Sequence, residues 1–272
     1  MIVLRPKGPF KVPVEAEILS PEHLCGKSAG EIGRMEVLYG RRRKRVEELF
    51  SVEERGEGEV LRLEGDFGRV KHVGAGMTRG RIEVKGKVGM HLGREMKGGE
   101  IFVEGEVGDW MGAEMSGGRI EVRGKAGNLV GAAYRGSKVG MKGGTIIVRG
   151  EAGREVGEKM RRGIIVVEGR MGDFAGALMT GGTIVCFGEM GEGAGGGMER
   201  GTILAFKRPP LLPTFQYSCL YLPSFLPLLL RYLQREGLPV REEHLKGKYE
   251  RYDGDLACSG KGEILVWREG TC

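Results

Sequence analysis

The sequence has few cysteines, few prolines in its centre and no long hydrophobic run. Its five cysteines show no C-x-x-C spacing, which argues against a disulfide framework or a cysteine metal site and favours a reducing, cytoplasmic location. The longest apolar stretch, CLYLPSFLPLLL at 219–230, is too short to span a bilayer and contains two prolines. The N-terminal residues MIVLRPKGPFKVPVE contain no apolar signal core. We therefore expect a protein without a membrane partner.

Concentrated charge of one sign and clustered histidines are also missing. The formal net charge of +6 comes from 43 basic and 37 acidic residues that are mixed through most of the chain, which argues against nucleic-acid binding. The dense run RRRKR at 41–45 is interpreted as a surface turn or a contact with another subunit. The four histidines, which lie far apart in the sequence, are His23, His72, His91 and His244. We therefore predict no metal site and no catalytic residue in this chain.

Glycine is abundant instead, with 51 of 272 residues, and it recurs with a fixed period. There is no Gly-X-Y triplet and there are only ten prolines, so neither collagen nor a low-complexity linker fits. The glycines belong to a 19-residue unit, of which IEVKGKVGMHLGREMKGGE at 82–100 is one copy. Successive units begin at Ile82, Ile101, Ile120, Ile146, Ile165, Ile184 and Ile203. This series of equal steps, with one longer step of 26 residues, predicts a repeat architecture.

The positions within a unit indicate short strands joined by corners. Apolar residues stand at even offsets from the isoleucine, usually at +2, +6, +10 and +14, and this two-residue period is typical of strands rather than helices. Glycines at +4, +7 and +11 predict corners that need a positive φ or a close approach of two backbones. The predicted turn glycines are Gly86, Gly89, Gly93, Gly105, Gly108, Gly112, Gly124, Gly127, Gly131, Gly150, Gly153, Gly157, Gly169, Gly172, Gly176, Gly188, Gly191 and Gly195.

The fold class that follows is all-β: a right-handed β-helix, or β-solenoid, of about seven to eight 19-residue rungs stacked about 4.8 Å apart. Prolines bound this region, since all ten lie at or before Pro21 or at or after Pro209. Open ends of such a stack expose strand edges and need caps. We predict an N-terminal cap over 1–58, the glycine-rich β-helix over 59–207, and a C-terminal extension over 208–272 that packs on the β-helix or on a partner.

The longer step places seven extra residues near YRGSKVG at 134–140. We expect a loop that leaves the rung there and carries Arg135 and Lys138. Insertions in repeat proteins usually map to loops on one face, often the face that binds. The loop is therefore either part of a binding face or a tolerated surface bulge.

Two outward positions of the unit change from mostly charged to wholly apolar along the repeat. One is the residue after the isoleucine, and the other lies two positions further on. The apolar residues at these positions in the last units are Ile147, Val166, Val185, Leu204, Phe187 and Phe206. An exposed apolar strip of this size would be a liability. We predict that either residues 208–272 or another polypeptide covers it, and we take these six residues as partner-facing candidates.

Three stretches resemble the C subunit of formylmethanofuran dehydrogenase, nearly from end to end of the chain. They are MEVLYGRRRKRVEELFSVEERG at 35–56, GAAYRGSKVGMKGGTIIVRG at 131–150 and YERYDGDLACSGKGEILV at 249–266. The glycine repeat also resembles the C-terminal β-helix of glutamate synthase, the GXGXG domain, but the amidotransferase and flavin domains of that enzyme are missing. The chain departs from the pattern of the dehydrogenase family around 209–246, which is unusually apolar.

The resemblance implies a subunit of a cytoplasmic complex that reversibly reduces CO2 and forms N-formylmethanofuran in methanogenesis. In that family this chain is a structural scaffold without a cofactor of its own, and partner subunits hold the tungsten or molybdenum pterin, the zinc pair and the iron–sulfur clusters. Its partners are the other subunits of the complex. Methanofuran, a carboxylate-rich carrier, would pass near the surface, where Arg135 and Lys138 could guide it electrostatically. A related bacterial formyltransferase/hydrolase complex has a similar C subunit, and the residues do not decide between the two.

Two other classes of function stay open beside the scaffold. A free-standing carbohydrate- or anion-binding β-solenoid would need stacked aromatics along one face. We expect none, because Trp110 is the only tryptophan of the repeat and the aromatics show no ladder in the sequence. A hydrolase would need a convergent pair of acids in a cleft, and the sequence offers no candidate pair.

Overall fold

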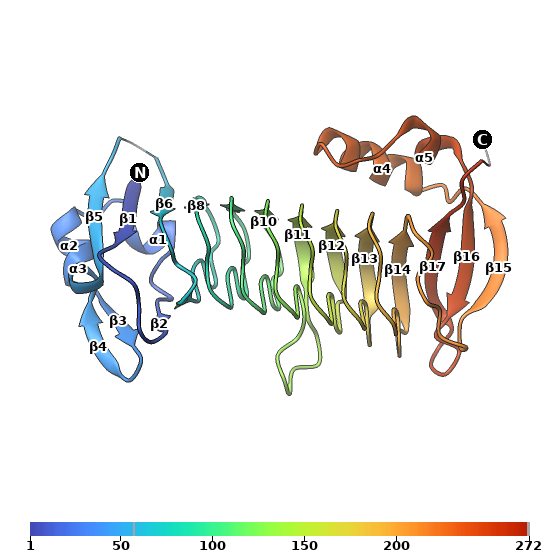
Figure 1. Ribbon diagram of the computed structural model, residues 1–272, viewed down its shortest axis with the longest axis horizontal. Helices are drawn as coiled ribbons and strands as arrows, with labels where there is room; N and C mark the ends of the chain where they lie inside the picture. The colour runs from blue at the N-terminus through green and yellow to red at the C-terminus, as the bar shows by residue number, and fades with distance from the viewer. Residues whose placement is uncertain (57, 271–272) are drawn as a thin grey trace.

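The computed structural model describes residues 1–56 and 58–270 of the chain, and its regular structure is mostly β. The strands of the repeat are β6 (Val60–Glu64), β8 (Arg81–Lys85), β9 (Glu100–Val103), β10 (Arg119–Val122), β11 (Lys142–Val148), β12 (Arg162–Val167), β13 (Thr180–Cys186) and β14 (Arg200–Ala205). Figure 1 shows these strands side by side along the long axis of the molecule, with the helices gathered near its two ends.

The N-terminal elements lie together at one end, blue in Figure 1. They are β1 (Ile2–Pro6), β2 (Val14–Glu15), α1 (Pro21–Leu24), α2 (Ala29–Arg34), β3 (Glu36–Tyr39), β4 (Arg42–Arg45), α3 (Val46–Leu49), β5 (Phe50–Glu54) and β7 (Val70–Lys71). The local sequence sets the helix starts, since Pro21 follows Ser20 at the first position of α1 and a capping box joins Ser28 to Glu31 at α2. The basic run at 41–45 falls on the mostly exposed hairpin of β3 and β4.

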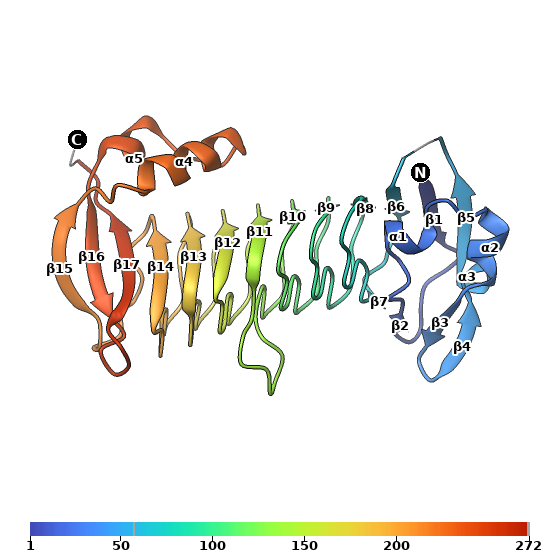
Figure 2. The same cartoon turned by 180° about the vertical axis from the view of Figure 1, so that it is seen from behind.

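The C-terminal elements lie at the other end. They are β15 (Gln216–Tyr221), α4 (Leu226–Arg235), α5 (Glu242–Lys246), β16 (Tyr249–Gly254) and β17 (Lys261–Trp267). Pro227 stands in the first turn of α4, where a missing backbone N–H costs no helical hydrogen bond. β15 and β16 pair up to Tyr221 and Tyr249, so the connection between these two strands contains both helices. Figure 2 shows the helices beside the last strands of the repeat.

One large sheet joins the two ends of the molecule. It holds thirteen strands in the order β15-β16-β17-β14-β13-β12-β11-β10-β9-β8-β6-β1-β5. All neighbours from β17 to β1 pair in parallel, whereas the pairs β1–β5, β16–β17 and β15–β16 are antiparallel. A second sheet has the order β4-β3-β2-β7. The prediction of a mainly β protein is confirmed, and its centre is a large parallel sheet.

The isoleucine that starts each unit sets the register of this sheet. Neighbouring units align these isoleucines from Ile82 to Ile203 without a slip. The extra residues 134–140 do not disturb the alignment, because they lie between two units that are still paired in step. Beyond the repeat, Ile203 is paired with Ile264 of β17, so the C-terminal segment adds one more strand in the same register.

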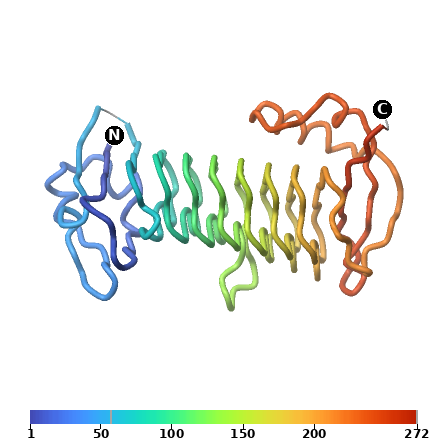
Figure 3. Tube along the Cα trace, in the orientation of Figure 1, coloured from blue at the N-terminus to red at the C-terminus, as the bar shows by residue number. Residues whose placement is uncertain are grey.

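A second line of parallel contacts runs beside the sheet. Isolated bridges at offset +6 join each unit to the next, from Phe67 to Met190. The methionines at offset +14, such as Met96 and Met115, are fully buried. One hydrophobic core therefore runs along the repeat and into both ends. Figure 3 shows the same course of the backbone in successive units.

Candidate functional site

Two physical reasons require glycine at the predicted turn positions. The glycines at offset +11 have φ values between +62° and +72°, as at Gly93 and Gly195. Most of those at +4 and +7 have no positive φ, but they lie against the backbone of the preceding unit. A Cβ on Gly169, for example, would stand 2.7 Å from the carbonyl oxygen of Gly150. A larger residue at either kind of position would push neighbouring units apart.

The predicted loop at 134–140 leaves the sheet between β10 and β11, and it is the green loop in Figure 1. The two basic side chains that the sequence singled out, Arg135 and Lys138, are both exposed on it. The loop therefore presents two cations to solvent at the middle of the repeat.

Tyr134 anchors the start of this loop. Its backbone N–H donates to Glu114 Oε1 at 3.1 Å, and its hydroxyl lies 2.7 Å from His91 Nδ1. The backbone N–H of Ser137 in turn donates to the carbonyl of Tyr134 at 2.9 Å. The cations on the loop are thus held near a fixed base.

Tyr134 also packs against a stack of three rings that come from the three preceding units. The centroids of His72 and His91 lie 4.6 Å apart with 5° between their planes, and those of His91 and Trp110 lie 5.5 Å apart at 22°. The Tyr134 ring lies beside both His91 and Trp110, with centroid separations of 5.6 Å and 6.2 Å. The expectation that the repeat has no aromatic ladder was wrong, because rings that lie far apart in the sequence meet in the structure. The first three rings occupy the same position in successive units, 19 residues apart, and the parallel register places equivalent positions side by side.

The geometry makes this stack a support for the loop. Burial lowers the pKa of His91 to about 4, and His72, Lys71 and Arg94 act in the same direction, so the His91 ring is neutral at pH 7. The rings cover one another's inner faces, and a bound sugar would need such faces to be free. The stack therefore strengthens the case for an anchored loop rather than for a carbohydrate platform.

The apolar strip is covered by the C-terminal segment of the chain itself. Four of the six predicted residues are fully buried, namely Ile147, Val166, Val185 and Leu204. The fully buried α4 side chains in the same cluster are Leu226, Leu230 and Leu233. The sequence left open whether residues 208–272 or another polypeptide covers the strip, and the structure shows that residues of the same chain cover it. Contact with a partner stays a prediction for Phe187 and Phe206, which are only partly buried.

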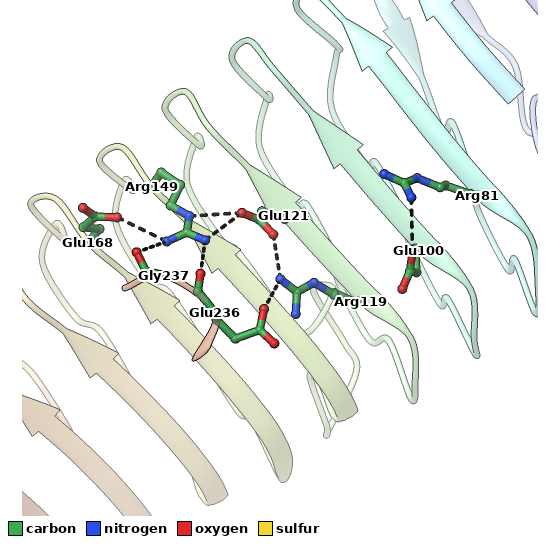
Figure 4. Close-up of polar contacts among 8 residues, drawn as sticks. All are labelled: Arg81, Glu100, Arg119, Glu121, Arg149, Glu168, Glu236 and Gly237. Atoms are coloured by element: carbon green, nitrogen blue, oxygen red, sulfur yellow. Dashed lines mark hydrogen bonds and ion pairs between the residues drawn. The ribbon is translucent and has the colours of Figure 1, made fainter. Parts of the chain in front are cut away.

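A network of ion pairs and hydrogen bonds fastens the C-terminal end of α4 to the sheet (Figure 4). Arg149, directly after β11, donates to Glu121 Oε1 at 2.9 Å. It also donates to the backbone carbonyls of Glu236 and Gly237, at 2.5 and 3.1 Å. Arg119 bridges the carboxylates of Glu121 and Glu236, at 2.6 and 2.5 Å. Carbonyls at a helix C-terminus lack intrahelical partners, and Arg149 supplies one.

The electrostatics of this network depend on Glu121. Burial opposes the charged form of the Glu121 carboxyl group, but hydrogen bonds from Arg119 and Arg149 outweigh burial and lower its pKa. The carboxylate is therefore charged at neutral pH and holds both arginines in place.

Phe187 and Phe206 line a hollow at the edge of the same cluster. Their rings stack at 4.4 Å with 7° between the planes. His244 and Trp267 continue the wall of rings, with centroid separations of 4.7 Å from Phe206 to His244 and 5.0 Å from His244 to Trp267. The hollow has a volume of about 440 Å3. Burial lowers the pKa of His244, so this wall is neutral as well as aromatic.

The described part of the chain shows no group of three His, Cys, Asp or Glu residues that could hold a metal ion. In that same part, no helix is both long and apolar enough to cross a bilayer. Cys25, Cys186, Cys219 and Cys258 are free thiols, and Cys272 lies outside the described residues.

The glycine repeat places the chain in a known family. The sequence model of the GXGXG-motif family matches residues 69–210, which is more than half of the chain. The chain therefore belongs to the GXGXG-motif family.

Curated relatives that match about a third of the chain are C subunits of formylmethanofuran dehydrogenases. The C subunit of the molybdenum-containing formylmethanofuran dehydrogenase 1 of Methanosarcina barkeri is 35% identical over 93 residues, which is 33% of this chain and 31% of the relative. The C subunit of the tungsten-containing formylmethanofuran dehydrogenase 2 of Methanothermobacter marburgensis is 36% identical over 93 residues, which is 33% and 34% of the two chains. The matched stretch thus spans about a third of the length of these curated relatives.

A solved structure is similar over nearly the whole chain. It is the crystal structure of the formyltransferase/hydrolase complex from Methylorubrum extorquens in complex with methylofuran. One of its chains is 36% identical, with a TM-score of 0.91, and the match covers 98% of this chain and 100% of that one. The chain is thus homologous over about a third of its length to C subunits of formylmethanofuran dehydrogenases, and over nearly its whole length to a chain of the formyltransferase/hydrolase complex.

Proposed function

We propose that the chain is a non-catalytic scaffold subunit of formylmethanofuran dehydrogenase, the complex that reversibly reduces CO2 and forms N-formylmethanofuran in methanogenesis. The observation that carries the proposal is the similarity to relatives named as the C subunit and, over 98% of the chain, to a chain of a multi-subunit complex. The uninterrupted core supports it, because a stack of equal units makes a long and regular surface for partners.

In this proposal the repeat is a right-handed β-helix in which each 19-residue unit forms one rung and the glycines form the corners. The aligned isoleucines and the line of bridges at offset +6 support this description. Residues 1–58 form the N-terminal cap, 59–207 the β-helix, and 208–272 the C-terminal extension that packs on it.

The cofactors of the reaction are assigned to partner subunits of a cytoplasmic complex. These are the tungsten or molybdenum pterin, the zinc pair and the iron–sulfur clusters. The names of the relatives support this assignment, since the enzymes to which they belong contain molybdenum in one case and tungsten in the other.

An affinity pull-down of the tagged full chain from its native host, under anoxic conditions, tests the proposal. We expect the other subunits of the complex to co-purify, together with tungsten or molybdenum measured in the eluate. Recovery of the chain alone would overturn the scaffold and favour an independent binding β-solenoid.

A second candidate is the C subunit of a formyltransferase/hydrolase complex. It is favoured by the extent of the structural match, which covers 100% of the other chain, whereas the matches to the dehydrogenase chains cover about a third of them. The same pull-down separates the two. Co-purified formyltransferase and hydrolase activities without tungsten or molybdenum would select the second candidate.

The loop at 134–140 is proposed to guide the carboxylate-rich carrier to the complex. Exposed cations raise the local concentration of an anionic ligand and speed its capture at low ionic strength. Replacing Arg135 and Lys138 with Ala in the assembled complex should raise the KM for methanofuran about two- to fivefold and reduce its dependence on salt. Steady-state rates at low and high salt measure both effects.

A matched control uses two other exposed cations of the repeat. Lys85→Ala with Arg170→Ala removes the same charge from positions outside the loop. This pair should leave the KM near that of the wild type. If the loop variant and the control give the same KM at low salt, the loop has no guiding role.

A further inference from the structure

Helix α4 has one strongly apolar side, and it also exposes a large apolar side chain on the opposite side. Leu226, Leu230 and Leu233 form the side that packs on the sheet. On a helix, residues three or four apart lie on one side, and this spacing defines a second side that points away from the buried one. We call it the outer face of α4, and it consists of Phe225, Leu228, Arg231 and Arg235.

The apolar part of the outer face is open to solvent. Leu228 is 77% exposed and Phe225 is 42% exposed. Exposed groups of large apolar side chains mark interaction surfaces. The outer face therefore has the composition of a surface that becomes covered.

The position of this face is fixed. The buried leucines hold α4 along its length. Its C-terminal end is held by the ion pair between Arg119 and Glu236 and by the hydrogen bond from Arg149 to the carbonyl of Glu236 (Figure 4). A partner would meet a surface that is already in place, so binding would cost little ordering of this helix.

The charges on the outer face have one sign. Arg231 and Arg235 are exposed, neither has an ion pair among the described residues, and α4 itself contains no acidic side chain. Glu236, the acidic residue directly after the helix, is engaged by Arg119. The face thus combines apolar side chains with two unpaired guanidinium groups, and carboxylates are the groups that guanidinium pairs with best.

We propose that the outer face of α4 docks a neighbouring protein subunit through an apolar surface rimmed by carboxylates. The inference rests on the proposed function and adds to it the position and the chemistry of one contact between subunits. The arginines flank the apolar residues, as polar and charged side chains do at the rim of a protein–protein interface. Their positive charge would complement carboxylates on a protein surface, so we take a protein as the occupant.

Variants of the tagged full chain in the native host test the proposal. Phe225→Glu with Leu228→Glu should reduce the amount of co-purified partner subunits at least about tenfold, because it places carboxylates against an apolar, acid-rimmed surface. Arg231→Glu with Arg235→Glu should also weaken retention, most strongly at low salt. Circular dichroism and the unfolding temperature check that the variants fold, which we expect because these side chains are exposed.

The matched control is Leu256→Glu, which changes a leucine that is 49% exposed in the turn between β16 and β17. It should retain the partners as the wild type does. Equal recovery from the wild type and from the variant with Phe225→Glu and Leu228→Glu would overturn this inference and leave the proposed function intact, whereas a wild-type chain without partners would overturn both.

Two other occupants would also show themselves and would replace the proposed one. If the purified wild type is a dimer that Leu228→Glu converts to a monomer, with no effect on the recovery of partners, the face binds a second copy of this chain. If the wild type binds vesicles of anionic phospholipid and the variant does not, again with unchanged recovery of partners, the face binds a lipid surface.

Discussion

At the scale of single residues, the glycines at offset +11 combine a left-handed backbone with a crowded interior. Gly176 has a φ of +69°, and a Cβ on it would lie 2.8 Å from Ile203 Cδ1. Gly136 in the loop has a φ of +89°, but nothing lies within 4 Å of the place where its Cβ would stand. The two glycines therefore separate the cost of the backbone conformation from the cost of crowding.

We expect Gly136→Ala to lower the free energy of unfolding by about 1 kcal/mol, because a Cβ is disfavoured at positive φ. Gly176→Ala should lower it by about 2–4 kcal/mol, because overpacking of the core adds to the same backbone term. Denaturant unfolding of both variants measures the difference. If both variants lose the same free energy of unfolding, the contact between the new Cβ of residue 176 and Ile203 adds no cost.

The lowered pKa of His91 makes the stability of the chain depend on pH. The pKa is about 4 in the folded chain, against the ordinary value of 6.5 expected in the unfolded chain. Between these values the unfolded chain binds a proton that the folded chain does not. The contribution of His91 to stability is therefore complete above about pH 6.5 and is lost as the pH falls towards 4.

His91→Asn should make stability less dependent on pH in this window. Asn tolerates the positive φ of 66° at this position and does not titrate. The full shift would be worth about 3 kcal/mol, and because His91 is partly exposed we expect about 1–2 kcal/mol after screening. Unfolding free energies at pH 4.5 and 7 measure the change. Leu129→Asn, at the equivalent position two units further on, is the control and should keep the wild-type slope.

At the scale of elements, the contact between α4 and the sheet has an apolar part and a polar part. The apolar part is the row of leucines on the strip, and the polar part is Arg149 with the carbonyls of Glu236 and Gly237. The apolar contact has no direction, so it permits α4 to slide. The hydrogen bonds of Arg149 have defined geometry and fix where the helix ends.

Arg149→Gln should loosen α4 without unfolding the sheet. Hydrogen bonds of charged groups contribute about 1.5–3 kcal/mol, so amide hydrogen exchange within Leu226–Arg235 should become roughly 10- to 100-fold faster. Mass spectrometry of peptides from this helix measures the rate. Arg154→Gln is the control, since Arg154 pairs with Asp173 at 3.1 Å and does not contact α4. Unchanged exchange in Arg149→Gln would mean that the leucines alone hold the helix.

The strands and their register could be predicted from the sequence because they depend on spacing alone. Equal steps between isoleucines place equivalent residues side by side, and the sheet follows these steps from Ile82 to Ile203. The strand at Ile264 was not recognised as a further member of the series, because the segment before it breaks the 19-residue step.

The candidate site was less predictable, because it depends on contacts that spacing does not fix. The apolar positions of the strip would be the same whether residues 208–272 or a partner covered them. The choice between the two depends on tertiary packing, which the sequence pattern does not contain. The stack of His72, His91 and Trp110 could have been found, since the three residues are 19 apart. It was missed because histidines were compared with metal-site spacing rather than with the repeat.

At the scale of the whole molecule, the cover over the strip is a separable insertion between two paired strands. Tyr221 of β15 faces Tyr249 of β16, so residues 222–248 leave and re-enter the sheet at one point. A two-residue Asn-Gly turn can join antiparallel strands at such a point. Replacing 222–248 with Asn-Gly should therefore remove α4 and α5 while the thirteen-stranded sheet remains.

That deletion should expose the four side chains of the strip that α4 now buries. We expect the deleted chain to keep its β-type circular dichroism, to bind an apolar dye several-fold more strongly and to self-associate at micromolar concentration, because a large exposed apolar patch seeks another surface. Dye fluorescence and light scattering measure both effects. The control combines the same deletion with a polar threonine at each of the four positions: Ile147→Thr, Val166→Thr, Val185→Thr and Leu204→Thr. This control should restore a monomer, because the sheet is unchanged and only the exposed apolar surface is lost. A deleted chain that stays monomeric and binds no dye would show that the strip does not need its cover, and the reason for the C-terminal helices would then lie in the outer face of α4 alone.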